Sequence, residues 1–181
     1  VPRELRGTAA PFRYNDLASF DAALASLKEP PAAIVMEPMR SQLPRDHFVD
    51  QIAARCRAAG AVFVLDEVTS GLRCGLPGAH TRLGVIPDLV VYAKAMSNGF
   101  PFGAVVGRDE IMRAADASFI SSSYWTDAVG PAAALAVLDQ AERLDLATVI
   151  WAKGEAFQAT WRVLAARHPA ARVVIGGIPA V

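Results

Sequence analysis

Three charged residues stand directly after apolar segments that have the length of β-strands. They are Glu37 after residues 32–36, Asp66 after residues 61–65, and Lys94 after residues 89–93. Ligands of open α/β sheets bind beyond the carboxyl ends of the strands. The three side chains are therefore candidates for chemistry at one edge of a sheet.

Lys94 and Asp66 together indicate covalent chemistry with an aldehyde cofactor. A lysine buried at a strand end tends to lose its charge, because an unpaired ammonium is costly to bury. The neutral amine is a nucleophile that forms a Schiff base, most commonly with pyridoxal phosphate (PLP). A carboxylate such as Asp66 would keep the pyridine nitrogen of that cofactor protonated. The alternative for Lys94 is a strand-end residue whose amine lies in water.

A serine-rich segment supplies candidate phosphate ligands. Ser121, Ser122 and Ser123 precede Tyr124 and Trp125, and their hydroxyl and backbone N–H groups could bind a phosphate. An ordinary polar loop has the same composition, so the segment supports the cofactor only together with Lys94 and Asp66.

The pair Asp66-Glu67 has a second interpretation. An apolar strand that ends in Asp-Glu also describes the Mg²⁺-binding strand of P-loop NTPases. That class requires Gly-x-x-x-x-Gly-Lys-Ser/Thr, which is absent from these 181 residues. It also leaves Lys94 without a role.

Strands and helices alternate along the chain in a way that is typical of a mostly parallel α/β sheet. The run 61–65 has no alternation, which predicts a strand covered on both faces. A further strand is expected at 103–107, and residues 173–181 read as the start of another. Helices are expected at 17–27 after the cap Asn15-Asp16, from Pro44 and Asp46 to Gly60, at 109–115, at 127–144 and at 146–167.

Composition restricts the class of protein. The chain is 53% hydrophobic and 20% charged, and its 18 basic and 18 acidic residues cancel, which disfavours nucleic acid as a partner. No apolar run is long enough to cross a membrane. The two cysteines lack the spacing of metal ligands, so no metal is expected. Reduced thiols and a cytoplasmic location are expected.

Six sequence motifs, in order between Tyr14 and Leu138, resemble the class III aminotransferases of the fold type I PLP enzymes. The resemblance is strongest to the branch similar to glutamate-1-semialdehyde 2,1-aminomutase. The motifs are Tyr14-Asn-Asp-Leu-Ala-Ser19, Ile34-Val-Met-Glu-Pro38, Val64-Leu-Asp-Glu-Val-Thr-Ser-Gly-Leu-Arg73, Gly84-Val-Ile-Pro-Asp-Leu89, Ala93-Lys-Ala-Met-Ser-Asn-Gly-Phe-Pro-Phe-Gly103 and Ser121-Ser-Ser-Tyr-Trp-Thr126.

The resemblance implies a role for each matching residue. Lys94 forms the Schiff base and moves the proton, and Asp66 pairs with the pyridine nitrogen. Val68 packs on the ring face, Thr69 lies near the ring hydroxyl, and Ser123 reaches the phosphate of the neighbouring subunit in a homodimer. Glu37 lies behind the first layer of contacts. Departures from the family pattern at Gln42, Thr69 and Tyr124 concern substrate choice.

The resemblance also implies the architecture. Residues 1–140 correspond to the second half of a three-layer PLP-binding large domain, and residues 141–181 to a connecting helix and the start of the small C-terminal domain. The chain is expected to be a piece of a longer enzyme. That enzyme transfers an amino group between a small amine or amino acid and a keto or aldehyde acceptor. An aminomutase, which shifts the amino group within one molecule, and a protein of this fold that has lost its chemistry are the alternatives.

Overall fold

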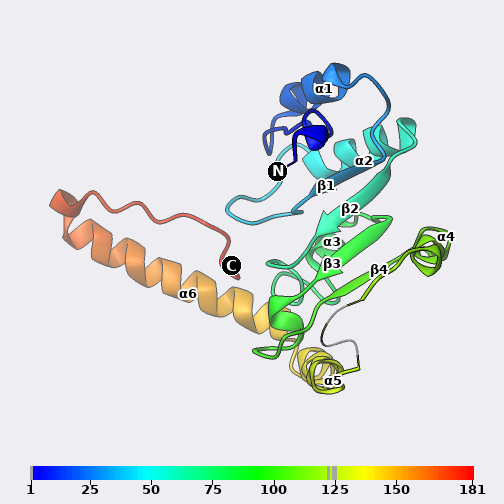
Figure 1. Cartoon of the computed structure of the whole chain (residues 1–181). Helices are drawn as coiled ribbons and strands as arrows, with labels where there is room; N and C mark the ends of the chain where they lie inside the picture. The colour runs from blue at the N-terminus through cyan, green and yellow to red at the C-terminus, as the bar shows by residue number, and fades with distance from the viewer. Residues whose placement is uncertain (1, 122, 124–125) are drawn as a thin grey trace.

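A four-stranded sheet in the order β1-β2-β3-β4 forms the centre of the molecule, as a computed structural model of residues 2–121, 123 and 126–181 shows (Figure 1). The strands are β1 (Ala33–Met36), β2 (Val62–Asp66), β3 (Leu89–Tyr92) and β4 (Ala104–Gly107). The first three are parallel, and β4 runs antiparallel to β3. The predicted, mostly parallel α/β sheet is confirmed.

Six α-helices and four short 3-10 helices connect and extend the sheet within the part of the chain that the structure describes. The α-helices are α1 (Leu17–Ser26), α2 (Phe48–Ala58), α3 (Ala79–Leu83), α4 (Asp109–Met112), α5 (Val129–Arg143) and α6 (Leu146–Arg167). The 3-10 helices are η1 (Arg3–Leu5), η2 (Lys94–Met96), η3 (Arg113–Ala117) and η4 (Pro169–Ala171). Helix α3 was not expected from the sequence.

Helix α1 begins where the sequence predicts. The Asp16 carboxylate accepts a 2.8 Å hydrogen bond from the Ser19 N–H, which satisfies a free donor of the first turn. That bond, together with the contact from Arg13, lowers the pKa of Asp16. Phe20 is the residue of this helix that is buried against the core.

Helix α2 begins later than predicted. Asp46 and His47 have φ angles of 49° and 54°, so the backbone is left-handed there and the helix starts only at Phe48. Asp46 therefore does not cap it. The predicted end is confirmed, because Gly60 follows the last turn with φ 68°, a conformation that favours glycine.

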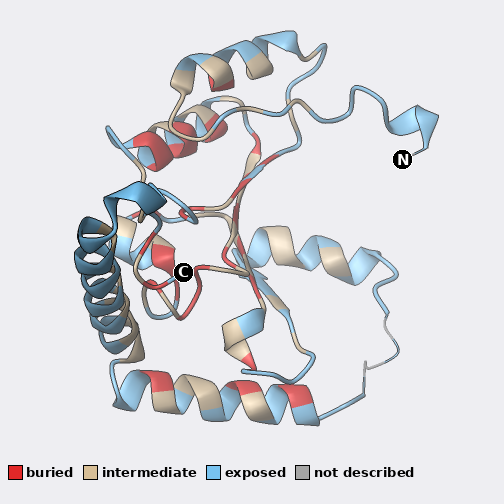
Figure 2. Ribbon diagram, turned by 90° about the vertical axis from the view of Figure 1, so that its left-hand side faces the viewer, coloured by how far each residue is buried: buried red, intermediate tan, exposed pale blue. Residues whose placement is uncertain are grey.

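The main core lies between one face of the sheet and helices α1 and α2. Its buried members are Phe20, Ile34, Met36, Phe48, Val49, Ile52, Ala53, Cys56, Ala61, Phe63, Leu65 and Val85. Figure 2 shows buried residues on α2 and along the strands, whereas α6 is largely exposed. Alternate strand residues face this core, as the period of two along a strand requires.

The opposite face of the sheet is partly open. Val35 is 60% exposed, and Val62 and Val64 are only half-buried. The expectation that the strand around 61–65 is covered on both faces is therefore wrong for this chain, because its helices α1 and α2 pack on one side. Three layers were predicted, with the sheet between two layers of helices. The chain contributes the sheet and one of the two helical layers.

Helix α6 projects from the sheet, and the last residues run back along it (Figure 1). Residues 173–181 form no strand, contrary to the prediction. Instead Ile178 and Ala180 are buried in a second cluster with Met39, Cys74 and Ala79. No helix among the described residues is long and apolar enough to span a membrane.

Candidate active site at the carboxyl edge of the sheet

Asp66 is the last residue of β2 and lies next to Val91 of β3 in the strand register. Its Oδ1 accepts a 3.0 Å hydrogen bond from the backbone N–H of Val68. Strand alternation places Asp66 on the same side as Val64, the partly open face, where its carboxylate is half-buried. A ligand at this edge of the sheet can therefore reach it.

Lys94 begins η2 immediately beyond β3, with a left-handed φ of 48°. Its Nζ donates a 2.8 Å hydrogen bond to the hydroxyl of Thr69. The Lys94 side chain is exposed in this chain, so the sequence argument from a buried, neutral amine is not confirmed. The reason is the same open sheet face, which leaves the ammonium in contact with solvent.

Thr69 and Val68 occupy the turn that follows Asp66. Both side chains are half-buried, and the Thr69 carbonyl accepts a 3.0 Å hydrogen bond from the guanidinium of Arg73. The structure thus brings four sequence-predicted residues together at the ends of β2 and β3: Asp66, Val68, Thr69 and Lys94. An amine, a hydroxyl and a carboxylate then share one edge.

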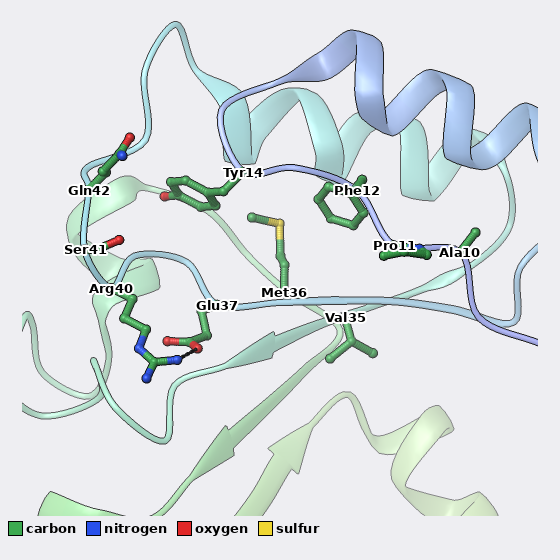
Figure 3. A pocket seen from close by; sticks show the side chains of 10 residues that line it. All are labelled: Ala10, Pro11, Phe12, Tyr14, Val35, Met36, Glu37, Arg40, Ser41 and Gln42. Atoms are coloured by element: carbon green, nitrogen blue, oxygen red, sulfur yellow. Dashed lines mark hydrogen bonds and ion pairs between the residues drawn. The ribbon is translucent and has the colours of Figure 1, made fainter. Parts of the chain in front are cut away.

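Glu37 and Gln42 line a separate pocket of 510 Å³ at the end of β1, shown in Figure 3. Glu37 forms a 3.1 Å ion pair with Arg40, and its second oxygen is buried without a hydrogen-bond partner in the described part of the chain. Gln42 is exposed and accepts a hydrogen bond from Arg45. In Figure 3, Met36 points toward Tyr14, whereas Glu37 lies on the opposite side of the strand.

The pocket and the Lys94 edge are adjacent through the sheet. Met36 pairs with Leu65, so the next residues, Glu37 just after β1 and Asp66 at the end of β2, lie at the same edge of neighbouring strands. Tyr14 closes the far side of the pocket, where its hydroxyl donates a 2.6 Å hydrogen bond to the Pro38 carbonyl. Burial raises the pKa of Tyr14 to about 12, so this hydroxyl remains a donor at neutral pH.

The serine-rich segment is less well placed. Ser123 is exposed in a turn, and no hydrogen bond from it to another described residue is present. Tyr124 lies outside the described residues, as do Ser122 and Trp125. Among the described residues of this segment, none forms a hydrogen bond with the residues around Lys94.

Glu67 is a residue whose role the sequence analysis missed. It is fully buried on the face opposite to Asp66 and binds helix α3. The P-loop interpretation of the Asp-Glu pair requires both carboxylates to face one site. Here they face opposite sides of the sheet. The signal available in the sequence was its place one residue after Asp66. Successive residues of a strand face opposite sides of the sheet, so Glu67 faces the core.

Comparisons with known proteins show the family to which the chain is similar. Residues 12–177 match the model of the family Aminotransferase class-III. The chain is 34% identical to the 3-aminobutyryl-CoA aminotransferase of Cloacimonas acidaminovorans (strain Evry), over 88% of the chain and 40% of that protein. It is 33% identical to the glutamate-1-semialdehyde 2,1-aminomutase of Pyrobaculum neutrophilum, over 79% of the chain and 35% of that protein.

Solved structures give the same result for the fold. The chain superposes on the FumI protein of Sphingopyxis sp. MTA144, solved in its PLP internal aldimine form, with a TM-score of 0.82 and 30% identity. The match covers 88% of this chain and 40% of FumI. The acetylornithine aminotransferase of Elizabethkingia anophelis matches with a TM-score of 0.75 and 27% identity, over 86% of this chain and 42% of that one. The chain thus spans about two fifths of the length of the relatives it matches.

Proposed function

Because the chain belongs to the class-III aminotransferase family, we propose that the full-length protein is a PLP-dependent aminotransferase with its reaction centre at Lys94. The observation that carries the proposal is the 2.8 Å contact between the Lys94 ammonium and the Thr69 hydroxyl, beside the Asp66 carboxylate. The substrates would be a small amine or amino acid and a keto or aldehyde acceptor.

The residues of this edge fit the cofactor chemically. Bound PLP supplies an electron sink for a carbanion next to the reacting nitrogen. Lys94 provides the amine that would hold it covalently, and Asp66 the negative charge for its pyridine nitrogen. Val68 would pack against the ring, and Thr69 would lie near the ring hydroxyl. The partly open sheet face beside Val64 leaves this edge accessible.

Proton movement is the task of the chain's own residues. Lys94, once free, is the base that would take a proton from the substrate carbon and return it at the next position. The Thr69 hydroxyl accepts a hydrogen bond from its amine and so limits the directions in which the side chain can swing. Positioning of this kind lowers the entropy cost of the proton transfer.

The remaining assignments extend the proposal to the assembled enzyme. Ser123 would contact the phosphate bound by the partner subunit of a homodimer, and Glu37 would support the site from behind. Gln42 and Tyr124 would select the substrate. Residues 1–140 would belong to the large domain and 141–181 to the connecting helix and the start of the small domain. The proposed location of the enzyme is the cytoplasm.

The test uses the three lysines of the chain, Lys28, Lys94 and Lys153. Full-length protein would be mixed with PLP, its visible absorbance recorded, and the complex reduced with borohydride and mapped by peptide mass. The expected label is on Lys94. Lys94→Ala should lose both label and transamination, whereas the exposed controls Lys28→Ala and Lys153→Ala should keep both. A label on another lysine, or no visible band, contradicts the proposal.

The aminomutase remains the second candidate, and aminomutases are among the relatives. Thr69 and Gln42 differ from the aminomutase pattern, which favours transfer between two molecules. The two activities are separated by their need for an acceptor. An aminotransferase turns over only when a second keto compound is supplied, whereas an aminomutase converts its substrate without one.

A further inference from the structure

Glu67 is the one charged side chain among the described residues that has no exposed surface. It directly follows Asp66, but strand alternation turns it to the opposite, core-facing side. A carboxylate in such a position must be hydrogen-bonded, because burying an unpaired charge is costly. The partners of Glu67 therefore indicate what it does.

All three donors to this carboxylate come from the first turn of α3. The Oε2 atom accepts a 2.5 Å hydrogen bond from the Ala79 N–H. The Oε1 atom accepts one of 2.8 Å from the His80 N–H and lies 2.7 Å from His80 Nδ1. An ionised carboxylate can only accept, so the His80 tautomer with a hydrogen on Nδ1 makes this contact a hydrogen bond.

The loop before α3 is shaped around the carboxylate. A Cβ atom on Gly78 would lie 2.7 Å from Glu67 Oε2 and 2.7 Å from His80 Nδ1. Because Gly78 has an extended φ of −157°, the glycine is needed for space and not for its backbone conformation. The fit leaves no room for another side chain between Glu67 and α3.

The backbone of Glu67 fixes the turn that carries the site. Its N–H donates to the Val91 carbonyl of β3 at 2.9 Å, and its carbonyl accepts from the Gly71 N–H at 2.8 Å. Val68 and Thr69 lie between these two anchors. A Cβ on Gly71 would lie 2.7 Å from the backbone carbonyl oxygen of Glu67, so this turn is also closely packed.

Helix α3 is itself held from the far side. Ala79 is fully buried in the second cluster, together with Cys74 and Ile178. The guanidinium of Arg82 lies 3.7 Å from the ring centre of Trp151 in α6. The short helix is therefore a fixed point to which Glu67 can tie the end of β2.

We propose that Glu67 is a positioning residue for amino transfer: its carboxylate ties the Val68–Thr69 turn to α3 and so holds the Thr69 hydroxyl beside Lys94. The inference rests on the proposed function. Glu67 touches neither Lys94 nor Thr69, and it acts through the backbone that the two anchors fix.

The test compares Glu67→Gln with two controls in the full-length protein loaded with PLP. The amide keeps the size of the side chain but turns an NH₂ group toward one of the α3 donors. Glu110→Gln changes an exposed glutamate that is paired with Arg108, and Ile52→Val trims the main core without touching the site. Steady-state kinetics would give kcat and KM. The melting temperature, the PLP affinity, the pH midpoint of the visible band and the hydrogen exchange of residues 67–80 without cofactor would also be measured.

Glu67→Gln should lower kcat about tenfold with little change in KM. It should also move the pH midpoint of the visible band by about half a unit or more and speed exchange over residues 67–80. Ile52→Val should lower only the melting temperature, and Glu110→Gln should change nothing. If Glu67→Gln lowers the melting temperature but leaves kcat, midpoint and exchange as in the unmodified protein, Glu67 is merely structural and the inference is wrong.

A second pair of variants covers the case in which Glu67→Gln does not fold. His80→Ala removes the side-chain donor to Oε1, whereas His80→Asn can place an amide N–H in the same direction. His80→Ala should reproduce the shifts of midpoint and exchange, and His80→Asn should restore the original values. Equal behaviour of the two variants overturns the inference. Failure of the unmodified protein to fix PLP on Lys94 refutes the proposed function instead, and is recognised before any variant is compared.

Discussion

The ammonium of Lys94 and the hydroxyl of Thr69 lie 2.8 Å apart, although 25 positions separate the residues in sequence. Thr69 stands in the turn after β2, and Lys94 begins the 3-10 helix after β3. Parallel pairing of β2 with β3 brings both strand ends to one edge and makes the contact possible.

Thr69→Val should lower kcat/KM about three- to tenfold, because it removes a hydrogen bond to the exposed Lys94 amine. Valine has nearly the same shape as threonine, so packing is retained. Thr69→Ser keeps the hydroxyl and should stay close to the unmodified protein. Steady-state kinetics of the full-length enzyme measures the difference, and equal activity of the valine and serine variants would show that the hydroxyl has no part in the reaction.

Asp66→Asn should lower kcat about 10²- to 10³-fold while changing PLP affinity much less. The asparagine oxygen can still accept the hydrogen bond from the Val68 N–H, so the substitution removes mainly the negative charge. Asp139→Asn, an exposed position on α5, serves as the control. A variant that loses PLP affinity in proportion to kcat would instead indicate that Asp66 only holds the cofactor.

Stability should fall as the pH rises from 9 toward 11, in part because of Cys74. Burial, assisted by the charge of Glu67, raises the pKa of this thiol from 9.0 to about 11. The unfolded chain therefore releases the proton first, and the contribution that is complete below pH 9 is lost as the pH passes toward 11. The loss is at most about 1.4 kcal/mol per pH unit for one thiol.

Cys74→Ala should make this decline shallower, as urea unfolding at pH 8, 9 and 10 would show. Cys56, whose pKa burial also raises to about 11, and Tyr92, raised by burial to about 12, keep part of the slope in the variant. The same slope with and without Cys74 would mean that its thiol is not protected from ionisation in the folded state.

Gly154→Ala should destabilise the protein, although alanine is the better helix former by about 1 kcal/mol. A methyl group at this position of α6 would overlap the backbone carbonyl of Pro179. The C-terminal segment would have to move, at a cost of about 1–3 kcal/mol for overpacking. Lys153→Ala, one residue earlier and exposed, should change the free energy of unfolding by less than about 0.5 kcal/mol.

Urea unfolding and limited proteolysis near residue 179 measure both effects of Gly154→Ala. The tail should become more susceptible to cleavage in this variant and not in Lys153→Ala. An increase in stability, as helix propensity alone predicts, would show that the tail does not pack on α6 in solution.

The sequence by itself determined the order of the four strands and of the α-helices other than α3, and the charged residues at the carboxyl ends of β1, β2 and β3. Apolar runs of strand length, separated by helical periodicity, allow little besides a parallel sheet. In such a sheet Glu37, Asp66 and Lys94 must follow the same edge. The motifs around Asp66 and Lys94 also identified the family, because they occur in one order along most of the chain.

Only the tertiary structure decided which surfaces are covered. The run 173–181 is apolar and reads as a strand, but it pairs with no strand in the part of the chain that the structure describes. Instead Ile178 is buried in one cluster with Ala79 of α3. Lys94 was expected to be buried, yet it is exposed because the chain's helices pack on the other face of the sheet. Burial depends on what packs against a residue, and local pattern does not contain that information.

Glu67 shows the same limit at the site. Its neighbour Asp66 marks it in the sequence, but its partners Ala79 and His80 lie 12 and 13 positions away in a helix of five residues that no periodicity reveals. A carboxylate finds its donors through the folded loop, whose path is set by long-range packing. The sequence thus determined which residues reach the edge of the sheet, and the tertiary structure decided what holds them there.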